Sequence, residues 1–114
     1  NGSLLWVVED KENADYIGYA GISDQLLDQE FAAKFYIAID PTKRKKGYGL
    51  ESEKRILDYV KAQQKHSCFL HSCILSNVGS IKMAEKLNLM FIGIEYDKEN
   101  SVNSEYIFVL NLLS

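Results

Sequence analysis

Short hydrophobic runs alternate with polar turns along the first third of the chain, and this pattern predicts β-strands. Residues 4–9 (LLWVVE) and 16–22 (YIGYAGI) form two such runs, and the polar segment 10–15 between them predicts a β-hairpin. Residues 31–40 (FAAKFYIAID) are almost continuously apolar, which indicates a strand buried on both faces. We expect residues 23–30, which are largely polar, to be a connection between the second and third strands.

Helical spacing of apolar residues occurs twice in the rest of the chain. Residues 50–64 predict a first helix, and residues 80–87 predict a second. The inward positions of the first helix are Ile56, Leu57 and Val60. Those of the second helix are Ile81, Ala84 and Leu87. Charged residues of the first helix, Glu53 among them, are expected to face solvent, and Asn88 is expected to end the second helix in a left-handed turn.

The order of the predicted elements fixes a fold class. Further strands are expected at residues 67–76, 89–97 and 105–112. The first helix connects two buried strands, and such a strand–helix–strand crossover implies a parallel pair in the centre of the sheet. We therefore predict one α+β domain over residues 1–114, with a mixed α/β sheet whose parallel pair is flanked by antiparallel hairpins and helices.

Composition and charge narrow the possible partners and location. A formal net charge of -3 argues against a broad nucleic-acid surface, and no apolar run approaches the ~20 residues that span a bilayer, so neither nucleic acid nor a membrane is an expected partner. Cys68 and Cys73 lie on opposite faces of one predicted strand, and reduced thiols of this kind indicate a cytoplasmic protein. His66 and His71 lack ligand-spaced neighbours, so we expect no metal site. For His71, a local hydrogen-bond partner is favoured over a position facing a binding gap.

The stretch at residues 44–49 (RKKGYG) is the strongest chemical signal in the chain. It lies between a buried strand and a helix N-terminus, where backbone N–H groups lack partners and attract a phosphate. Gly47 and Gly49 allow a close backbone approach. A P-loop would continue with Lys and Ser or Thr, and a dinucleotide fingerprint would have glycine at position 52, which is serine. On these residues alone, an anion cradle and a solvated basic turn remain alternatives.

The flanking residues add a resemblance. Residues 35–49 (FYIAIDPTKRKKGYG) closely resemble the cofactor-binding segment of the GNAT superfamily of N-acetyltransferases, with its hydrophobic strand, acid–Pro step and Arg-x-x-Gly-x-Gly turn. Asn77 and Ser80, followed by residues 85–89 (EKLNL), are similar to a second segment of that family. This form looks closest to the branch that acetylates ribosomal-protein N-termini, and the resemblance covers roughly residues 4–112.

The resemblance implies a function and a set of site residues. The function is transfer of an acetyl group from acetyl-CoA to a primary amine, such as a protein N-terminus, a lysine or a small amine, by direct attack in a ternary complex. Ser80 is the catalytic candidate, because it falls where this branch has a hydroxyl near the CoA sulfur. The residues that the resemblance assigns to acetyl-CoA are Ile37, Ala38, Ile39, Arg44, Lys45, Lys46, Gly47, Tyr48, Gly49, Leu50, Asn77 and Ser80.

The chain departs from the family pattern in several places. A tyrosine that often donates a proton to the thiolate is replaced by Ala84, and a glutamate that often serves as base is replaced by Lys34. Glu9 and Glu30 are the nearest substitutes for that base in the sequence. Family members usually have one more strand and two helices before the first hairpin. Without them the first strand would be an exposed edge, which a homodimer or a missing N-terminal segment would cover. A relative that binds CoA without efficient catalysis, and a non-enzymatic interaction module, are the alternatives.

Overall fold

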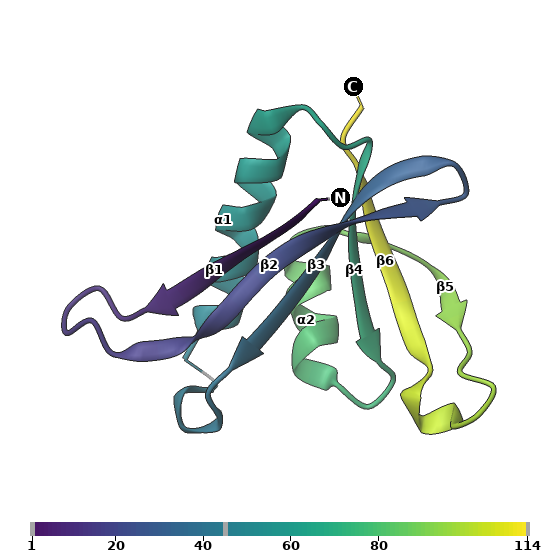
Figure 1. Cartoon of the computed structure of the whole chain (residues 1–114). Helices are drawn as coiled ribbons and strands as arrows, with labels where there is room; N and C mark the ends of the chain where they lie inside the picture. The colour runs from purple at the N-terminus through teal and green to yellow at the C-terminus, as the bar shows by residue number, and fades with distance from the viewer. Residues whose placement is uncertain (1, 45, 114) are drawn as a thin grey trace.

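The computed structural model describes residues 2–44 and 46–113, and these form one mixed sheet with helices packed against it (Figure 1). The strands are β1 (Ser3–Glu9), β2 (Tyr16–Leu27), β3 (Glu30–Ile39), β4 (Cys68–Ile74), β5 (Met90–Glu95) and β6 (Glu105–Asn111). The helices are α1 (Tyr48–Gln63) and α2 (Val78–Lys86), with short 3₁₀ turns η1 (Pro41–Lys43) and η2 (Ser101–Asn103).

The strand order is β1-β2-β3-β4-β6-β5, and β3 and β4 are the parallel pair at its centre. The hairpins β1–β2 and β5–β6 and the pair β4–β6 are antiparallel. Helix α1 makes the crossover from β3 to β4. The predicted α+β class, with a central parallel pair and antiparallel flanks, is therefore confirmed.

The segment between the second and third strands differs from the prediction. Residues 23–27 continue β2 instead of forming a polar connection, and β2 pairs with β3 as far as Leu27 opposite Glu30. Asp28 and Gln29 alone make the turn, with φ values of 48° and 72°. A two-residue hairpin turn with positive φ at both residues matches the twist of its strands. The sequence has no glycine here that would have predicted the turn.

Both helices cover the same face of the sheet, and the core lies between them and the strands. Ile56, Leu57 and Val60 of α1 are buried there, as predicted, and Ala84 of α2 belongs to the same cluster. Asn88 follows α2 with a φ of 60°, which confirms the left-handed turn.

The opposite face of the sheet carries only a small buried cluster around Leu70. Cys68 belongs to this cluster and Cys73 to the main core, so the two thiols lie on opposite faces, as predicted, and both are free. Burial raises the pKa of each thiol.

Candidate active site

A gap opens between the two central strands at their carboxyl ends. β3 and β4 are paired only from Ala32 opposite Cys68 to Phe35 opposite His71. Beyond His71 the strands diverge, and Figure 1 shows them separating as the two arms of an open V. The outer half of β3 is therefore only half-buried, whereas the sequence predicted burial on both faces along its whole length.

Backbone direction alternates along the free half of β3. The carbonyl of Ile39 accepts a hydrogen bond from Arg44 Nε (3.2 Å), whereas the N–H of Asp40 points the other way, to the carbonyl of Ile17 on β2 (2.8 Å). The backbone groups of Ile37 and Ile39 thus face the gap, and those of Ala38 face β2. Of the three strand residues assigned to the cofactor, Ile37 and Ile39 point their backbone groups toward the gap, and the Ile39 carbonyl already accepts the bond from Arg44.

A short turn leads from the end of β3 to the start of α1. The Asp40 carboxylate accepts hydrogen bonds from the N–H (2.9 Å) and hydroxyl (2.8 Å) of Thr42, and these bonds lower the pKa of Asp40. They fix the chain just after the gap. Arg44 and Lys46 are exposed beyond this point, and Lys45 lies outside the described residues.

Gly47 sits at the N-terminal end of α1 with a φ of 83°, a left-handed conformation that favours glycine. A Cβ built on Gly47 would meet nothing within 4 Å. Within the described part of the chain, no side chain caps this helix, so the N–H groups of Tyr48, Gly49 and Leu50 lie uncapped at the positive end of the helix dipole. An anion is the natural ligand for such an arrangement.

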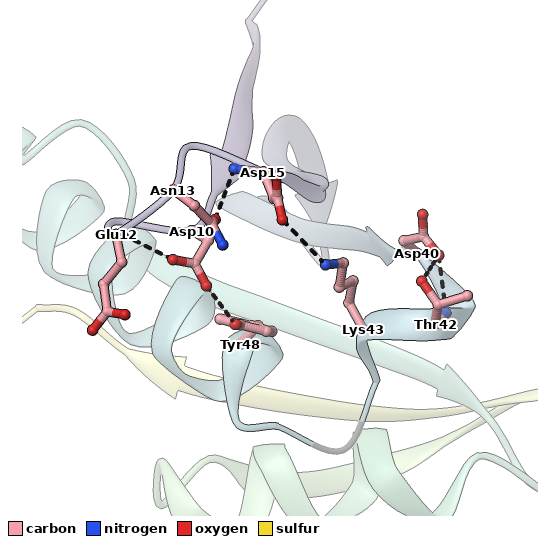
Figure 2. A network of polar contacts seen from close by, with 8 residues as sticks. All are labelled: Asp10, Glu12, Asn13, Asp15, Asp40, Thr42, Lys43 and Tyr48. Atoms are coloured by element: carbon pink, nitrogen blue, oxygen red, sulfur yellow. Dashed lines mark hydrogen bonds and ion pairs between the residues drawn. The ribbon is translucent and has the colours of Figure 1, made fainter.

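The turn is braced from outside by the loop between β1 and β2, as Figure 2 shows. The Tyr48 hydroxyl donates a hydrogen bond to Asp10 Oδ2 at 3.0 Å, and Lys43 Nζ lies 3.7 Å from Asp15 Oδ2. The hydrogen bond with Asp10 raises the pKa of Tyr48, and a backbone hydrogen bond from Glu12 lowers the pKa of Asp10. Tyr48 therefore holds the helix start in place with its side chain and leaves its backbone N–H available.

The second segment singled out in the sequence lies beside the first. Gly49 is close enough to α2 that an added Cβ would stand 3.2 Å from Met83 Sδ. Asn77 Oδ1 accepts the N–H of Ser80 (3.1 Å) and caps α2, and its side chain is otherwise exposed. The fold thus brings the first turn of α1 beside α2, through Gly49 and Met83.

Ser80 ends a buried chain of hydrogen bonds that the sequence did not reveal. His71 Nε2 lies 2.8 Å from Ser80 Oγ, and His71 Nδ1 lies 2.6 Å from Glu53 Oε2. His71 is 2% exposed and Glu53 is fully buried, so the prediction that Glu53 faces solvent is wrong. The partners of His71 come from α1 and α2, far from it in sequence.

The two carboxylates considered as substitute bases lie in different places. Glu30 begins β3, at the end opposite the gap, and accepts a hydrogen bond from the Ser67 hydroxyl (2.7 Å). Glu9 lines a cavity of about 630 Å³ between β1 and α1, whose walls include Trp6 and Tyr59. Neither carboxylate contacts Ser80 in the described structure, so the general base stays unassigned.

Among residues 2–44 and 46–113, no three His, Cys, Asp or Glu side chains are grouped so that they could bind a metal ion. Neither helix in this part of the chain has the length and apolar character that crossing a membrane requires.

Comparisons with known proteins identify relatives of this chain. YkkB of Bacillus subtilis, an uncharacterized protein, is 27% identical over 97 residues, which are 85% of this chain and 54% of YkkB. The chain therefore spans about half the length of the curated relative that it matches.

Solved structures share the fold at lower sequence identity. The spermidine N-acetyltransferase SpeG of Vibrio cholerae, as its F149A mutant, superposes with a TM-score of 0.81 and 18% identity over 98% of this chain and 67% of its own. The ribosomal-protein-S5-alanine acetyltransferase of Vibrio fischeri superposes with a TM-score of 0.81 and 17% sequence identity. The match covers 96% of this chain and 61% of that protein. The sequence pattern of the acetyltransferase (GNAT) domain matches residues 1–90, which is most of this chain. The protein is therefore a member of the GNAT acetyltransferase family.

Proposed function

We propose that this protein transfers an acetyl group from acetyl-CoA to a primary amine. The observation that carries the proposal is the open space at Gly47, where a left-handed glycine precedes an uncapped helix start beside the gap in the sheet. A pyrophosphate fits the uncapped helix start there, and an extended amide-bearing arm fits the edge of β3 that faces the gap.

Each assigned residue then has a definite task. Gly47, Tyr48, Gly49 and Leu50 hold the pyrophosphate with backbone N–H groups, while Arg44, Lys45 and Lys46 add positive charge around it. Ile37 and Ile39 pair with the pantetheine amides across the gap. Acetyl-CoA supplies the thioester, and the protein aligns it with the amine. Asn77 fixes the start of α2 and thereby places Ser80.

Transfer requires a neutral amine and a thiolate that can leave. Amines in proteins are mostly protonated at pH 7, with reference pKa values of about 8 to 10.4, so a proton must be removed before attack. Ser80 is our candidate for the hydroxyl that contacts the departing sulfur. Because Ala84 is buried in the core and has no hydroxyl, it cannot take that role.

Isothermal titration with acetyl-CoA tests the binding part of the proposal. We expect a micromolar dissociation constant, about -8 kcal/mol, and release of free thiol when a panel of amines is added. Binding without thiol release would favour a relative that binds CoA without efficient catalysis. Absence of binding would refute the proposed function.

A pair of glycine variants separates the cradle from general stability. Gly47→Ala places a methyl group where the pyrophosphate is expected and should weaken acetyl-CoA binding at least tenfold, about 1.4 kcal/mol. Gly93→Ala is the matched control, because Gly93 also has a positive φ (156°) with nothing within 4 Å of an added Cβ, but lies in β5. Equal effects of the two changes on binding would show that the cradle is misplaced.

The acceptor and the assembly are proposed more broadly. A primary amine is the acceptor class, and the named activities of the structural relatives, on spermidine and on a ribosomal protein, give the first amines to test. β1 forms one edge of the sheet, with Leu5 and Val7 more than half exposed, which supports a homodimer through this edge. Light scattering at several concentrations measures that association. The two free thiols support a reducing, cytoplasmic location.

A further inference from the structure

We propose that His71, held by Glu53, is the acid that restores the proton Ser80 gives to the departing thiolate. This inference rests on the proposed function and deepens it, because it assigns a proton source to a site that otherwise has only a serine. His71 and Glu53 are positioning residues in this scheme, since they act through the Ser80 hydroxyl.

The geometry of the three side chains is continuous. Glu53 Oε2 and His71 Nδ1 are 2.6 Å apart, and His71 Nε2 and Ser80 Oγ are 2.8 Å apart. When Glu53 accepts a hydrogen bond from Nδ1–H, the opposite ring nitrogen, Nε2, faces the Ser80 hydroxyl. The carboxylate therefore fixes which ring nitrogen exchanges a proton with Ser80. The chain runs from the fully buried Glu53 to Ser80, which is only half-buried at the start of α2.

The position of His71 links this chain to the gap. His71 is the last residue of β4 that pairs with β3, so its ring lies where the two strands begin to diverge. Ser80 lies in the first turn of α2, and Met83, one turn further along that helix, lies beside Gly49 in the first turn of α1. The proton path therefore ends on the side of the sheet where the acetyl-CoA arm is proposed to lie.

Few other groups face the imidazole. Phe35 of β3 stacks on it with ring centroids 6.1 Å apart, and Phe108 of β6 meets it edge-on at 6.0 Å. The titratable groups around it are Glu53 from α1 and Cys73 on β4. Burial raises the pKa of Cys73, and the negative charge of Glu105 on β6 contributes to raising it. Among the described residues, His71 thus links Ser80 to Glu53, and the Cys73 side chain is the other titratable group hydrogen-bonded to Ser80.

Stability does not account for this arrangement. Glu53 Oε1 is buried without a hydrogen-bond partner in the described structure, and such an atom is costly to bury. An apolar residue at position 53 would continue the stripe formed by Ile56, Leu57 and Val60 without that cost. A carboxylate kept in this place points to a role in the chemistry of its partner.

The chemistry explains why a serine needs the histidine. An alcohol is a weaker acid than a thiol, so Ser80 alone would not give a net proton to the sulfur. An imidazolium, with a reference pKa of about 6.5, is a stronger acid than a thiol at about 8.5. As the C–S bond breaks and its electron pair stays on sulfur, Ser80 passes its proton to sulfur and takes one from His71 Nε2. His71 becomes neutral, and solvent restores its proton as the amine nitrogen releases one.

Kinetics of four variants test the relay in the purified protein. His71→Gln and Ser80→Ala should each lower kcat by about 100-fold or more, while the dissociation constant for acetyl-CoA changes less than threefold. The double variant should be no slower than either single one, because the two residues act in one path. Glu53→Gln, which keeps a hydrogen bond to the ring, should lower kcat less than His71→Gln.

A second histidine provides the matched control. His66 is also buried and lies 2.7 Å from a carboxylate, Asp24 Oδ1, but stacks on Phe31 at the opposite end of β3. His66→Gln should leave kcat unchanged after correction for folded fraction. The pH profile of kcat should differ between the wild type and His71→Gln and should be unchanged in Cys73→Ala.

A readout without substrate checks the contact itself. In nitrogen NMR of the free protein, Ser80→Ala should shift the Nε2 resonance of His71 and leave both His66 nitrogens unchanged. Additive kinetic losses, or an unchanged Nε2 resonance, would overturn the relay while acetyl-CoA binding still supported the proposed function. An acetyl group found on Ser80 by mass spectrometry would also overturn it, because serine would then be a nucleophile. Absence of acetyl-CoA binding would overturn both proposals.

Discussion

The buried Glu53–His71 pair makes a sharp prediction about stability. Glu53→Leu leaves His71 Nδ1 without its partner in the core, and we expect it to lower the free energy of unfolding by about 2–3 kcal/mol. His71→Leu leaves a buried carboxylate with neither oxygen paired and should cost about 3–5 kcal/mol. For a chain of 114 residues, each kcal/mol corresponds to a fall in Tm of about 4 °C.

The double variant is the informative one. Replacing both residues with leucine removes both unsatisfied groups, so the loss should shrink to within about 1 kcal/mol of the wild type. Urea denaturation followed by circular dichroism measures all four proteins. If the double variant lost as much free energy of unfolding as the two single variants together, the reasoning would be refuted, because the two residues would not be satisfying each other's buried polar groups.

Three further predictions concern other parts of the fold. Gly18→Ala should lower the free energy of unfolding by about 1–3 kcal/mol, because its Cβ would stand 2.1 Å from the Ala38 carbonyl oxygen, and unchanged urea melts would contradict this. The hydrogen bond with His66 lowers the pKa of Asp24, so the stability it gives is present above its unfolded pKa of about 3.9 and is lost as pH falls through the lowered value. Asp24→Asn should therefore reduce the loss of stability between about pH 5 and pH 2, the range in which such a carboxylate titrates. If urea melts of the variant gave the same change in the free energy of unfolding with pH as the wild type, this prediction would be wrong. Because burial raises the pKa of both cysteines, iodoacetamide should label them much more slowly in the folded protein than in urea, and equal rates by mass spectrometry would disprove it.

The sequence predicted the architecture well where local pattern and burial agree. The strands with continuous apolar runs and the helix face formed by Ile56, Leu57 and Val60 came out as expected. The end of β2 was missed, because Asp24 and its polar neighbours resemble a loop. Their strand conformation is set by pairing with β3 and by the bond from Asp24 to His66.

The candidate site was only partly accessible from the sequence. The phosphate turn and Ser80 have local signatures, but the environment of Ser80 depends on contacts between distant segments. A signal did exist, since Glu53 lies three and four residues before Ile56 and Leu57 and so shares their face. His71 lies between Phe69 and Cys73 at a spacing of two, which places it on the helix-covered side of β4. The strand period and the helix period together therefore predict that His71 and Glu53 share one core.

The short pairing of β3 with β4 divides the sheet into two three-stranded sections, each from a continuous stretch of sequence. β1, β2 and β3 all precede α1, and β4, β5 and β6 all follow it. Cutting the chain between α1 and β4 would therefore give two fragments that each keep their own strand pairing and share the core. Since acetyl-CoA is proposed to lie across the gap, it would bridge the two fragments, and their reassembly would report its concentration.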